Sequence, residues 1–408
     1  MDAVIVAAGR GTRMRPLTDT RPKPLLPLGD RSILERTMDQ CAEFVDRFVL
    51  VVGYRRESIE DRIGEQYAGR PVEYVTQTQR LGTAHAIEQA RGIVSGSFLA
   101  LNGDVIVDGS ILERLAAADG HALAVTGVEN PTEYGVVETA EGSVRALHEK
   151  PEEPPSDRIN VGLYAFEASI FEAIDRIEPS SRGEYEITDA IDLLIADGKI
   201  VSAIDYDGTW LDVGRPWDLL EATEVVLSDL EGRIDGHVED GADVHGPVLV
   251  EEGARVRSGS YVEGPVLIRS GADVGPNAYV RGASVLGPDT RVGNAVEVKN
   301  SIVMEGTAVP HLSYVGDSIL GAEVNFGAGT TVANLRHDDE PVRMTIGDER
   351  VDSGRRKLGV IVGDGTKTGI DTSLNAGVKL GVEARTKPGE VVTRDRMKSR
   401  IDGTATER

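Results

Sequence analysis

The chain has 408 residues, of which 40% are hydrophobic and 27% charged, a composition typical of a folded globular protein. It contains no run of about 18 apolar residues and starts without a basic and apolar leader, so we expect neither a membrane span nor a secretory signal. The 68 acidic and 44 basic residues give a net charge of −24, which disfavours nucleic acid as a partner because phosphates would be repelled.

The basic residues are mostly arginine, since only nine of the 44 are lysine. An acidic chain with few lysines and few aromatic residues is typical of halophile proteins, which stay soluble in concentrated salt because charge repulsion is screened. The alternative is an ordinary acidic enzyme. The single cysteine, Cys41, excludes an intrachain disulfide and fits a reducing, cytoplasmic location.

Apolar runs alternate with helical patterns from residue 1 to about residue 228. Strands are predicted at residues 4–6, 48–52, 73–75 and 98–101, and helices at residues 33–44, 58–67, 84–94, 110–118 and 217–230. This alternation predicts a parallel sheet with helices on both faces. Ligands of such sheets bind at the carboxyl ends of the strands.

A glycine-rich loop follows the first predicted strand. Gly9 and Gly11 would let backbone N–H groups approach phosphates closely. The loop has neither the third glycine of a dinucleotide fingerprint nor the Lys-Ser/Thr of a P-loop, and alone it is equally compatible with a tight structural turn. Arg13 and Lys23 follow it, and two cations at this place suit a triphosphate, whose charge must be neutralised before a nucleophile can attack.

The sequence period changes to six residues from about residue 232. Aliphatic side chains occupy every sixth position from Val238 to Met304, and a new register starts with Val303, Val309 and Val315. After an interruption that includes residues 342–358, the pattern resumes at Val362, Leu374, Leu380 and Val392. This period fits neither a helix nor an ordinary sheet, and it predicts a parallel β-helix with one inward aliphatic residue on each short face.

A series of motifs in the first half resembles, in order, the sugar-1-phosphate nucleotidyltransferases. The motifs are residues 9–28, Gln77 with Leu81-Gly82-Thr83, Leu101-Asn102-Gly103-Asp104, Tyr134-Gly135-Val136-Val137, Glu149-Lys150-Pro151, Asn160-Val161-Gly162 and Trp210-Leu211-Asp212-Val213-Gly214. The resemblance implies an α/β domain with a Rossmann-like mixed sheet. It also implies that a sugar phosphate attacks a nucleoside triphosphate, so no general base is required.

The resemblance assigns roles to individual residues of the first half. The implied nucleotide-binding residues are Ala8, Gly9, Gly11, Thr12, Gln77, Gly82 and Thr83, and the implied sugar-phosphate-binding residues are Gly135, Glu149, Lys150 and Asn160. Arg13 and Lys23 would act on the phosphates as catalytic residues, while Asp104 and Asp212 would hold Mg²⁺, a hard ion that prefers carboxylates and phosphates. The motifs leave open whether the nucleotide is UTP or dTTP.

A second set of residues resembles the acetyltransferase half of the bifunctional glucosamine-1-phosphate N-acetyltransferase/N-acetylglucosamine-1-phosphate uridylyltransferase family. His311 matches the family's general base, and a histidine is suited to this task because its pKa lies near working pH. Tyr314 and Asn334 match amino-sugar ligands, Arg281 and Lys299 match phosphate ligands, and Ala328 matches an acetyl-CoA contact. The alternative reading of His311 is a buried structural histidine. The family also implies a left-handed coil and a homotrimer.

The chain departs from the bacterial family after Asn334. A lysine expected there is missing, and Leu335-Arg336-His337-Asp338 and Glu340 take its place, which resembles the archaeal branch. Arg343, Arg355, Arg356 and Lys357 are candidate replacements. We therefore expect a nucleotidyltransferase domain at 1–230, an acyltransferase β-helix at 231–395 and a polar tail at 396–408.

Three functions fit these observations. The first is a bifunctional enzyme that uses acetyl-CoA to acetylate glucosamine 1-phosphate and then couples the product to UTP. The second is a glucose-1-phosphate uridylyl- or thymidylyltransferase whose β-helix only mediates oligomerisation. The third, a non-catalytic subunit, is disfavoured because Arg13, Lys23, Asp104 and Asp212 are all present.

Overall fold

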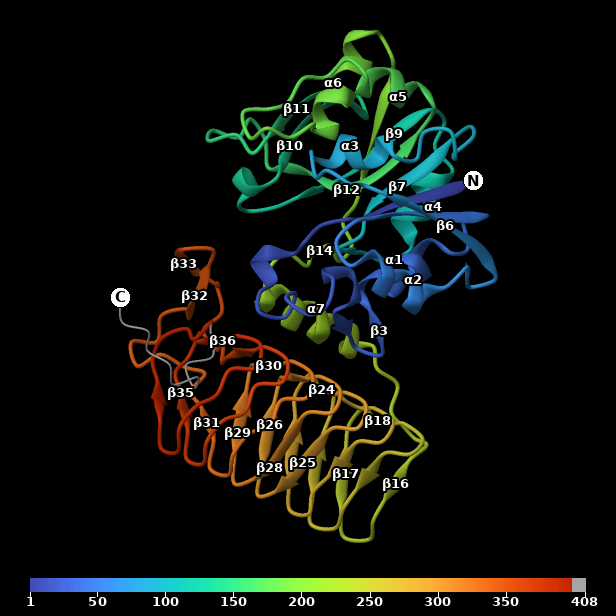
Figure 1. The fold of residues 1–408 in the computed structure, drawn as a ribbon. Coiled ribbons are helices and arrows are strands. Elements are labelled where there is room, and N and C mark those ends of the chain that lie inside the picture. Colours follow the sequence, from blue (N-terminus) through green and yellow to red (C-terminus); the bar gives the residue numbers. More distant parts are fainter. Residues whose placement is uncertain (398–408) are drawn as a thin grey trace. The chain divides into compact units, whose positions relative to one another are not determined.

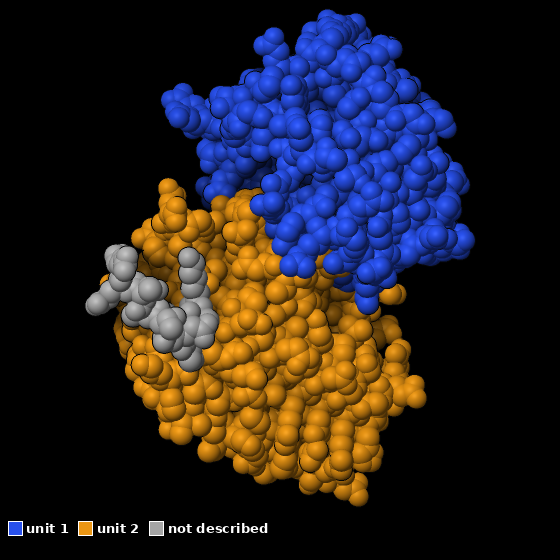
Figure 2. Space-filling view, in the orientation of Figure 1, with its two compact units in different colours: residues 1–10, 32–212 blue, residues 11–31, 213–408 orange. Residues whose placement is uncertain are grey.

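The computed structural model describes residues 1–397, so most of the expected polar tail lies outside the described residues. The chain forms two compact units, which Figure 2 distinguishes by colour. Unit 1 contains residues 1–10 and 32–212, and unit 2 contains residues 11–31 and those that follow residue 212. Within the described part of the chain, no helix is both long and apolar enough to cross a bilayer.

Unit 1 is built on a ten-stranded sheet with the order β10-β11-β13-β9-β12-β7-β1-β4-β6-β5. The strands are β1 (Asp2–Ala7), β4 (Arg47–Val52), β5 (Gln66–Tyr67), β6 (Arg70–Thr76), β7 (Phe98–Asn102), β9 (His121–Gly127), β10 (Gly135–Ala140), β11 (Ser143–Glu149), β12 (Arg158–Phe166) and β13 (Val201–Asp205). A separate ribbon pairs β8 (Val105–Ile106) with β14 (Leu211–Asp212).

The helices of unit 1 cover both faces of this sheet (Figure 1). They are α1 (Ile33–Cys41), α2 (Arg56–Ile63), α3 (Thr83–Glu88), α4 (Ser110–Ala116), α5 (Ser169–Ile174) and α6 (Ile187–Ala196), with a 3-10 turn at Pro131–Glu133. Residues of α3, α5 and α6 share one apolar core with Val4, Val49 and Phe98 of the central strands. The ring of Phe98 stacks on Phe171 of α5 with centroids 5.6 Å apart, which fixes this helix layer on the sheet.

The sheet is mixed, as the family resemblance implied, rather than fully parallel, as the alternation of elements had predicted. β1 runs parallel to β4 and β7, but β12 runs antiparallel to its neighbours β7 and β9. All five predicted helices also end earlier than expected, two of them by four or more residues. The helix expected to reach Tyr67 ends at Ile63, because Gly64 has a φ of +76° and the chain then forms β5. The helix expected to reach Val94 ends at Glu88 and continues as turns.

Unit 2 is dominated by the predicted β-helix, whose coils are stacked along its length (Figure 1). The first face contains β15 (Arg233–Ile234), β18 (Val248–Val250), β21 (Val266–Ile268), β24 (Ser284–Leu286), β27 (Ile302–Val303), β30 (Ile319–Leu320), β34 (Ile361–Val362) and β36 (Lys379–Leu380). The second contains β16 (His237–Val238), β19 (Arg255–Val256), β22 (Asp273–Val274), β25 (Arg291–Asn294) and β28 (Ala308–His311). The third contains β17 (Asp243–His245), β20 (Tyr261–Glu263), β23 (Tyr279–Arg281), β26 (Glu297–Lys299), β29 (Tyr314–Gly316), β31 (Thr331–Val332), β35 (Ser373–Leu374) and β37 (Val391–Val392).

The aliphatic residues of the six-residue period form the inner core of the coils. Val262, Val280 and Val298 are register partners on successive coils, and all three are fully buried. One expected position is wrong. Leu286 pairs with Val303 and not with Met304, because this coil is one residue shorter, and Met304 is buried just beyond the strand.

The interruption of the repeat contains an antiparallel hairpin, the β32–β33 hairpin, formed by β32 (Arg343–Ile346) and β33 (Glu349–Asp352). Unit 2 also includes the segment 11–31 and helix α7 (Pro216–Ser228). The segment contains 3-10 turns at Thr12–Met14 and Lys23–Leu25 and the strand β2 (Pro27–Leu28), which pairs with β3 (Arg31–Ser32). Arg21 ties the segment to the coils, because its Nη2 lies 2.7 Å from Glu305 Oε1 and 3.3 Å from Asp364 Oδ2.

Candidate active sites

Two half-buried carboxylates, Asp104 and Asp212, lie on the ribbon of unit 1. Asp212 stands directly opposite Val105, and Asp104 is the residue before Val105, so both lie at the same end of the β8–β14 pair. Among residues 1–397 no group of three or more acidic, histidine or cysteine side chains could hold a metal. The protein thus offers two oxygen ligands here, which fits Mg²⁺ because this ion usually takes its other ligands from water and substrate phosphates.

A close backbone contact fixes the position of Asp104. The N–H of Gly103 donates to the Val6 carbonyl oxygen at 3.0 Å, and a Cβ on Gly103 would lie 2.7 Å from that oxygen. Only glycine permits this approach at the carboxyl ends of β1 and β7. Asp104 is therefore held beside the strand that leads into Ala8 and Gly9.

The structure brings together the four residues expected to bind the sugar phosphate. Gly135 stands opposite Glu149 in the β10–β11 pair, and a Cβ on Gly135 would lie 3.2 Å from Glu149 Oε2 and 3.6 Å from Asn160 Cβ. The Asn160 amide donates to the Tyr164 hydroxyl at 2.7 Å. Lys150 follows β11 with an exposed side chain, while its N–H donates to the Tyr134 carbonyl at 3.1 Å.

An arginine that the sequence motifs did not indicate controls the charge at this site. Arg182 Nη2 donates to Glu149 Oε1 at 2.9 Å and to Glu186 Oε1 at 2.7 Å. Burial raises the pKa of Glu149, and the positive charge of Arg182 opposes that rise. Arg182 belongs to none of the motifs, so only its place in the fold reveals it.

Three of the expected nucleotide-binding residues, Gln77, Gly82 and Thr83, also lie in unit 1. Gln77 is buried, and its amide donates to the Gly82 carbonyl at 3.2 Å and lies 3.0 Å from His85 Nδ1. The Thr83 hydroxyl accepts the N–H of Ile187 at 3.2 Å. Gly82 has a φ of +104°, which favours glycine and turns the chain into α3.

The nucleotide loop is divided between the two units, since Ala8 and Gly9 belong to unit 1 and the loop residues from Gly11 onward belong to unit 2. Gly11 has a φ of +60°, and a Cβ there would lie 2.8 Å from Lys23 Cβ, so glycine allows the loop to close against Lys23. The Gly11 carbonyl accepts the Thr18 hydroxyl at 2.7 Å. Lys23 is buried, whereas Thr12 and Arg13 are exposed and available to a ligand.

The β-helix places four predicted residues on adjacent coils, and three of them share one polar network. Arg281 and Lys299 are register partners on β23 and β26, and Tyr314 lies on the adjacent β29. The Asn334 amide donates to the Tyr314 hydroxyl at 3.1 Å. The Arg281 guanidinium donates to Glu297 at 2.8 Å.

A buried carboxylate, Asp317, lies at the centre of this network, and sequence reasoning missed it. It accepts hydrogen bonds from Lys299 Nζ at 2.9 Å, Asn334 Nδ2 at 2.5 Å and Asn300 Nδ2 at 3.1 Å. Burial and the charge of Asp317 raise the pKa of Tyr314, so its hydroxyl stays protonated. The available signal was spacing, because Asp317 follows Lys299 by one coil.

His311 is the last residue of β28 and is exposed, so the alternative of a buried structural histidine is wrong. Its backbone is fixed, since its carbonyl accepts the Ser313 hydroxyl at 2.7 Å. Ala328 is half-buried on the following coil, where its carbonyl accepts the N–H of Asp371 at 2.8 Å. The residue after His311, Leu312, is 64% exposed, so this corner of the coil is open to solvent.

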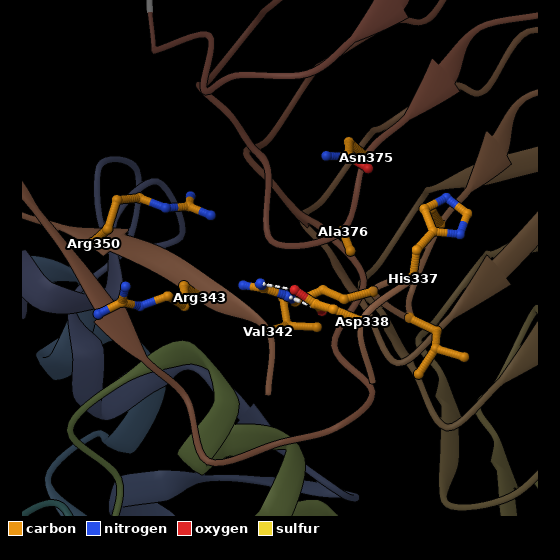
Figure 3. A pocket seen from close by; sticks show the side chains of 10 residues that line it. His337, Asp338, Val342, Arg343, Arg350, Asn375 and Ala376 are labelled. Atoms are coloured by element: carbon orange, nitrogen blue, oxygen red, sulfur yellow. Dashed lines mark hydrogen bonds and ion pairs between the residues drawn. The ribbon is translucent and has the colours of Figure 1, made fainter. Parts of the chain in front are cut away.

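A pocket of about 440 Å³ opens beyond Asn334 (Figure 3). It is lined by Ala333, Leu335, Arg336, His337, Asp338, Val342, Arg343, Arg350, Asn375 and Ala376. Figure 3 shows Arg343 and Arg350 on the β32–β33 hairpin. Arg336 forms an ion pair with Asp338. The lining is therefore cationic and suits a phosphorylated ligand.

Only one of the four candidate replacements for the missing lysine lines this pocket. Arg343 lines it, but the other two candidate arginines are paired elsewhere. Arg355 pairs with Glu224 of α7, and Arg356 Nη2 lies 2.7 Å from Asp339 Oδ1. Lys357 is exposed and does not line the pocket.

The fold and these sites define a nucleotidyltransferase joined to a β-helix with a second polar site. Residues 2–229 match the nucleotidyl transferase family, and residues 262–392 match the GMPPB C-terminal domain. The crystal structure of a UDP-glucose pyrophosphorylase complexed with UDP-glucose superposes with a TM-score of 0.52 and 25% identity, covering 56% of this chain and 98% of that one.

Full-length relatives define the family more narrowly. The bifunctional protein GlmU of Methanocaldococcus jannaschii is 46% identical, with 93% of this chain and 92% of the relative covered. A bifunctional sugar-1-phosphate nucleotidylyltransferase/acetyltransferase of Sulfurisphaera tokodaii is 39% identical, with 97% and 98% covered. The chain belongs to the family of bifunctional GlmU proteins.

Proposed function

We propose that this protein acetylates glucosamine 1-phosphate with acetyl-CoA and then transfers a uridylyl group from UTP to N-acetylglucosamine 1-phosphate, releasing pyrophosphate. The observation that carries the second activity is the polar network of Lys299, Tyr314 and Asn334 around the buried Asp317, with Arg281 on the neighbouring coil. Burying a carboxylate costs free energy unless donors surround it, and a coil that served only for oligomerisation would not need such an arrangement.

In the uridylyl transfer, Glu149 and Asn160 would hold the sugar, and the exposed Lys150 would hold its phosphate. Arg13 and Lys23 would neutralise the triphosphate, so that the sugar phosphate oxygen can attack the α-phosphorus while pyrophosphate leaves. Asp104 and Asp212 would hold Mg²⁺, which supplies positive charge to the phosphates. UTP rather than dTTP is the proposed nucleotide.

In the acetyl transfer, Arg281 and Lys299 would bind the sugar phosphate, and Tyr314 and Asn334 would orient the amino sugar. The exposed His311 imidazole would take a proton from the substrate amine as its nitrogen attacks the acetyl carbonyl carbon. The thioester C–S bond then breaks and CoA leaves as the thiol. Ala328 would contact acetyl-CoA, and the arginine-lined pocket of Figure 3 would receive its phosphates.

We also propose that the β-helix domain, residues 231–395, assembles the chain into a homotrimer in the cytoplasm. Its third face carries an outward aromatic row, in which the His245 and Tyr261 rings are 5.0 Å apart and the Tyr261 and Tyr279 rings 5.6 Å apart. Leu312 is 64% exposed at the next corner. Light scattering should give three times the chain mass, and L312N should lower it, while I200N, which changes an exposed residue of unit 1, should not.

The test of the two activities compares the wild type with H311A. The wild type should release CoA with glucosamine 1-phosphate and pyrophosphate with UTP and N-acetylglucosamine 1-phosphate. In H311A the rate of CoA release should fall by a factor of about 10²–10⁴, while the rate of pyrophosphate release should stay unchanged. A wild type that releases pyrophosphate but no CoA would support the alternative, a monofunctional nucleotidyltransferase with a scaffold coil.

A further inference from the structure

A second pocket of about 440 Å³ lies within unit 2 between the nucleotide loop and the coils. It is lined by Thr12, Arg13, Arg15, Thr345, Ile346, Gly347, Asp348, Lys379, Asp395 and Met397. Three parts of the chain that are far apart in sequence meet here, namely the turn after Gly11, the tip of the β32–β33 hairpin and strand β36. Of its lining residues, only Thr12 and Arg13 were assigned above to the nucleotidyltransferase site, and none was assigned to the acetyltransferase site.

Lys379 is the unusual residue of this pocket. It is only 4% exposed, and its Nζ has no hydrogen-bond or ion-pair partner within residues 1–397. Lysine is rarely buried without a partner, because the ammonium loses its hydration. Burial lowers the pKa of Lys379 to about 8, and the nearby Arg350 adds to this effect, while Asp395 opposes it. A bound anion would supply the direct partner that residues 1–397 do not give this ammonium.

The other charges at the pocket favour an anion that bridges the loop and the coil. Arg13 and Arg15 approach from the nucleotide loop, and Arg15 Nε lies 3.0 Å from Asp19. The pocket also contains Asp348, and Asp395, whose Oδ1 accepts the backbone N–H of Lys379 at 2.9 Å. Asp395 thus accepts a hydrogen bond from the backbone of β36. The Arg13 guanidinium and the Lys379 ammonium can then bind a ligand with several negative charges.

We propose that this pocket binds the terminal phosphates of the nucleoside triphosphate and the pyrophosphate that leaves, with Lys379 as a binding residue contributed by the β-helix. The assignment to an oligophosphate rests on the proposed uridylyl transfer, because Thr12 and Arg13 belong to the loop that would hold the triphosphate. The β-helix would then take part in the first reaction as well as the second.

The test uses the full-length chain and the variant K379M. Methionine preserves most of the buried volume and removes the charge, so the fold should survive. The matched control is K387M, which removes an exposed lysine from the same coils. Three quantities are measured for each chain: binding of inorganic pyrophosphate by calorimetry, KM for pyrophosphate in the reverse reaction, and the rate of acetyl transfer.

The expected result is a loss of pyrophosphate affinity of at least tenfold in K379M, with a similar rise in KM for pyrophosphate and an acetyl-transfer rate within twofold of the wild type. K387M should match the wild type in all three. An unchanged pyrophosphate affinity in folded K379M would overturn the inference and leave the proposed function intact. A wild type that binds pyrophosphate but forms no nucleotide sugar would instead refute the proposed uridylyl transfer.

Discussion

At the scale of single residues, Asp317 decides whether the polar site of the β-helix keeps its geometry. It is 3% exposed and joins Lys299 to Asn334, so both side chains depend on one carboxylate. An ammonium that loses its buried partner is left without compensation for its lost hydration.

We expect D317N to lower the free energy of unfolding by about 3 kcal/mol and to raise KM for glucosamine 1-phosphate. Denaturant titration and acetyl-transfer kinetics measure the two effects. The control is D197N, which breaks the exposed pair of Asp197 with Arg176 and should leave stability and KM unchanged. Equal stability of D317N and wild type would contradict the central role of Asp317.

Glu149 provides a pH test in unit 1. Burial raises its pKa in the folded chain, so the protonated form is the one that folding favours. Below the unfolded pKa, about 4.3, both states are protonated and Glu149 contributes nothing to the pH dependence. As the pH rises through and above that value, the ionised carboxylate destabilises the folded chain.

The variant E149Q should therefore gain stability relative to the wild type as the pH rises from about 4 to 7. Urea titrations at several pH values measure this difference. E172Q, which changes an exposed carboxyl of α5, should show no such trend. A gain that shrinks with rising pH would show that Arg182 outweighs burial at this position.

At the scale of elements, the β32–β33 hairpin is an insertion that lines the pocket proposed to bind acetyl-CoA. Arg343 projects from it into the pocket of Figure 3, and its backbone carbonyl lies against Gly377 of the coil. A side chain at Gly377 would collide with that carbonyl, so the hairpin is seated closely on the coils.

R343A should raise KM for acetyl-CoA about tenfold, because one charged hydrogen bond to phosphate is worth about 1.5–3 kcal/mol. The same variant should use acetyl-pantetheine, which lacks the nucleotide phosphates, as well as the wild type does. R356A, which removes an arginine that does not line the pocket, is the matched control. An equal loss with both acetyl donors would place Arg343 outside the phosphate contacts.

The elements also show what sequence can and cannot predict. A period of six reveals a β-helix because each inward position must be aliphatic. The change of register at Val303 is also visible in the sequence, but only the structure shows that Val303 and not Met304 pairs with Leu286. The antiparallel direction of β12 leaves no periodic trace either. Motifs indicate the residues expected to bind ligands, but Arg182 belongs to no motif and emerges only from the fold. For Asp317 the only signal in the sequence was its spacing from Lys299. Lys379 precedes the inward Leu380, so the repeat alone predicts that its side chain points outward. The structure shows that it is buried, beside a pocket that the β32–β33 hairpin also lines.

At the scale of the whole molecule, the net charge of −24 opposes compaction, while many ion pairs at the surface oppose unfolding. Salt weakens both effects, but isolated surface pairs contribute little. Screening of the net repulsion should dominate, as proposed for a protein adapted to concentrated salt.

We therefore expect the melting temperature to rise by several degrees between about 0.1 and 2 M KCl, over which the Debye length falls from about 10 Å to below 3 Å. Calorimetry at neutral pH measures this change. The gain should shrink near pH 5, where the net charge is smaller. A melting temperature that is flat or falls with KCl would favour the ordinary acidic enzyme.

Residues 11–31 are attached to the coils, and this limits how the coding sequences of the two units can be exchanged by recombination. The chain passes between the two units after residues 10, 31 and 212, so no single break separates them. Arg21 in this segment needs Glu305 and Asp364 from distant coils. If recombination replaced the β-helix by that of another protein, Arg21 would lose both carboxylate partners. We therefore expect folded recombinants to take residues 11–31 and the β-helix from the same parent.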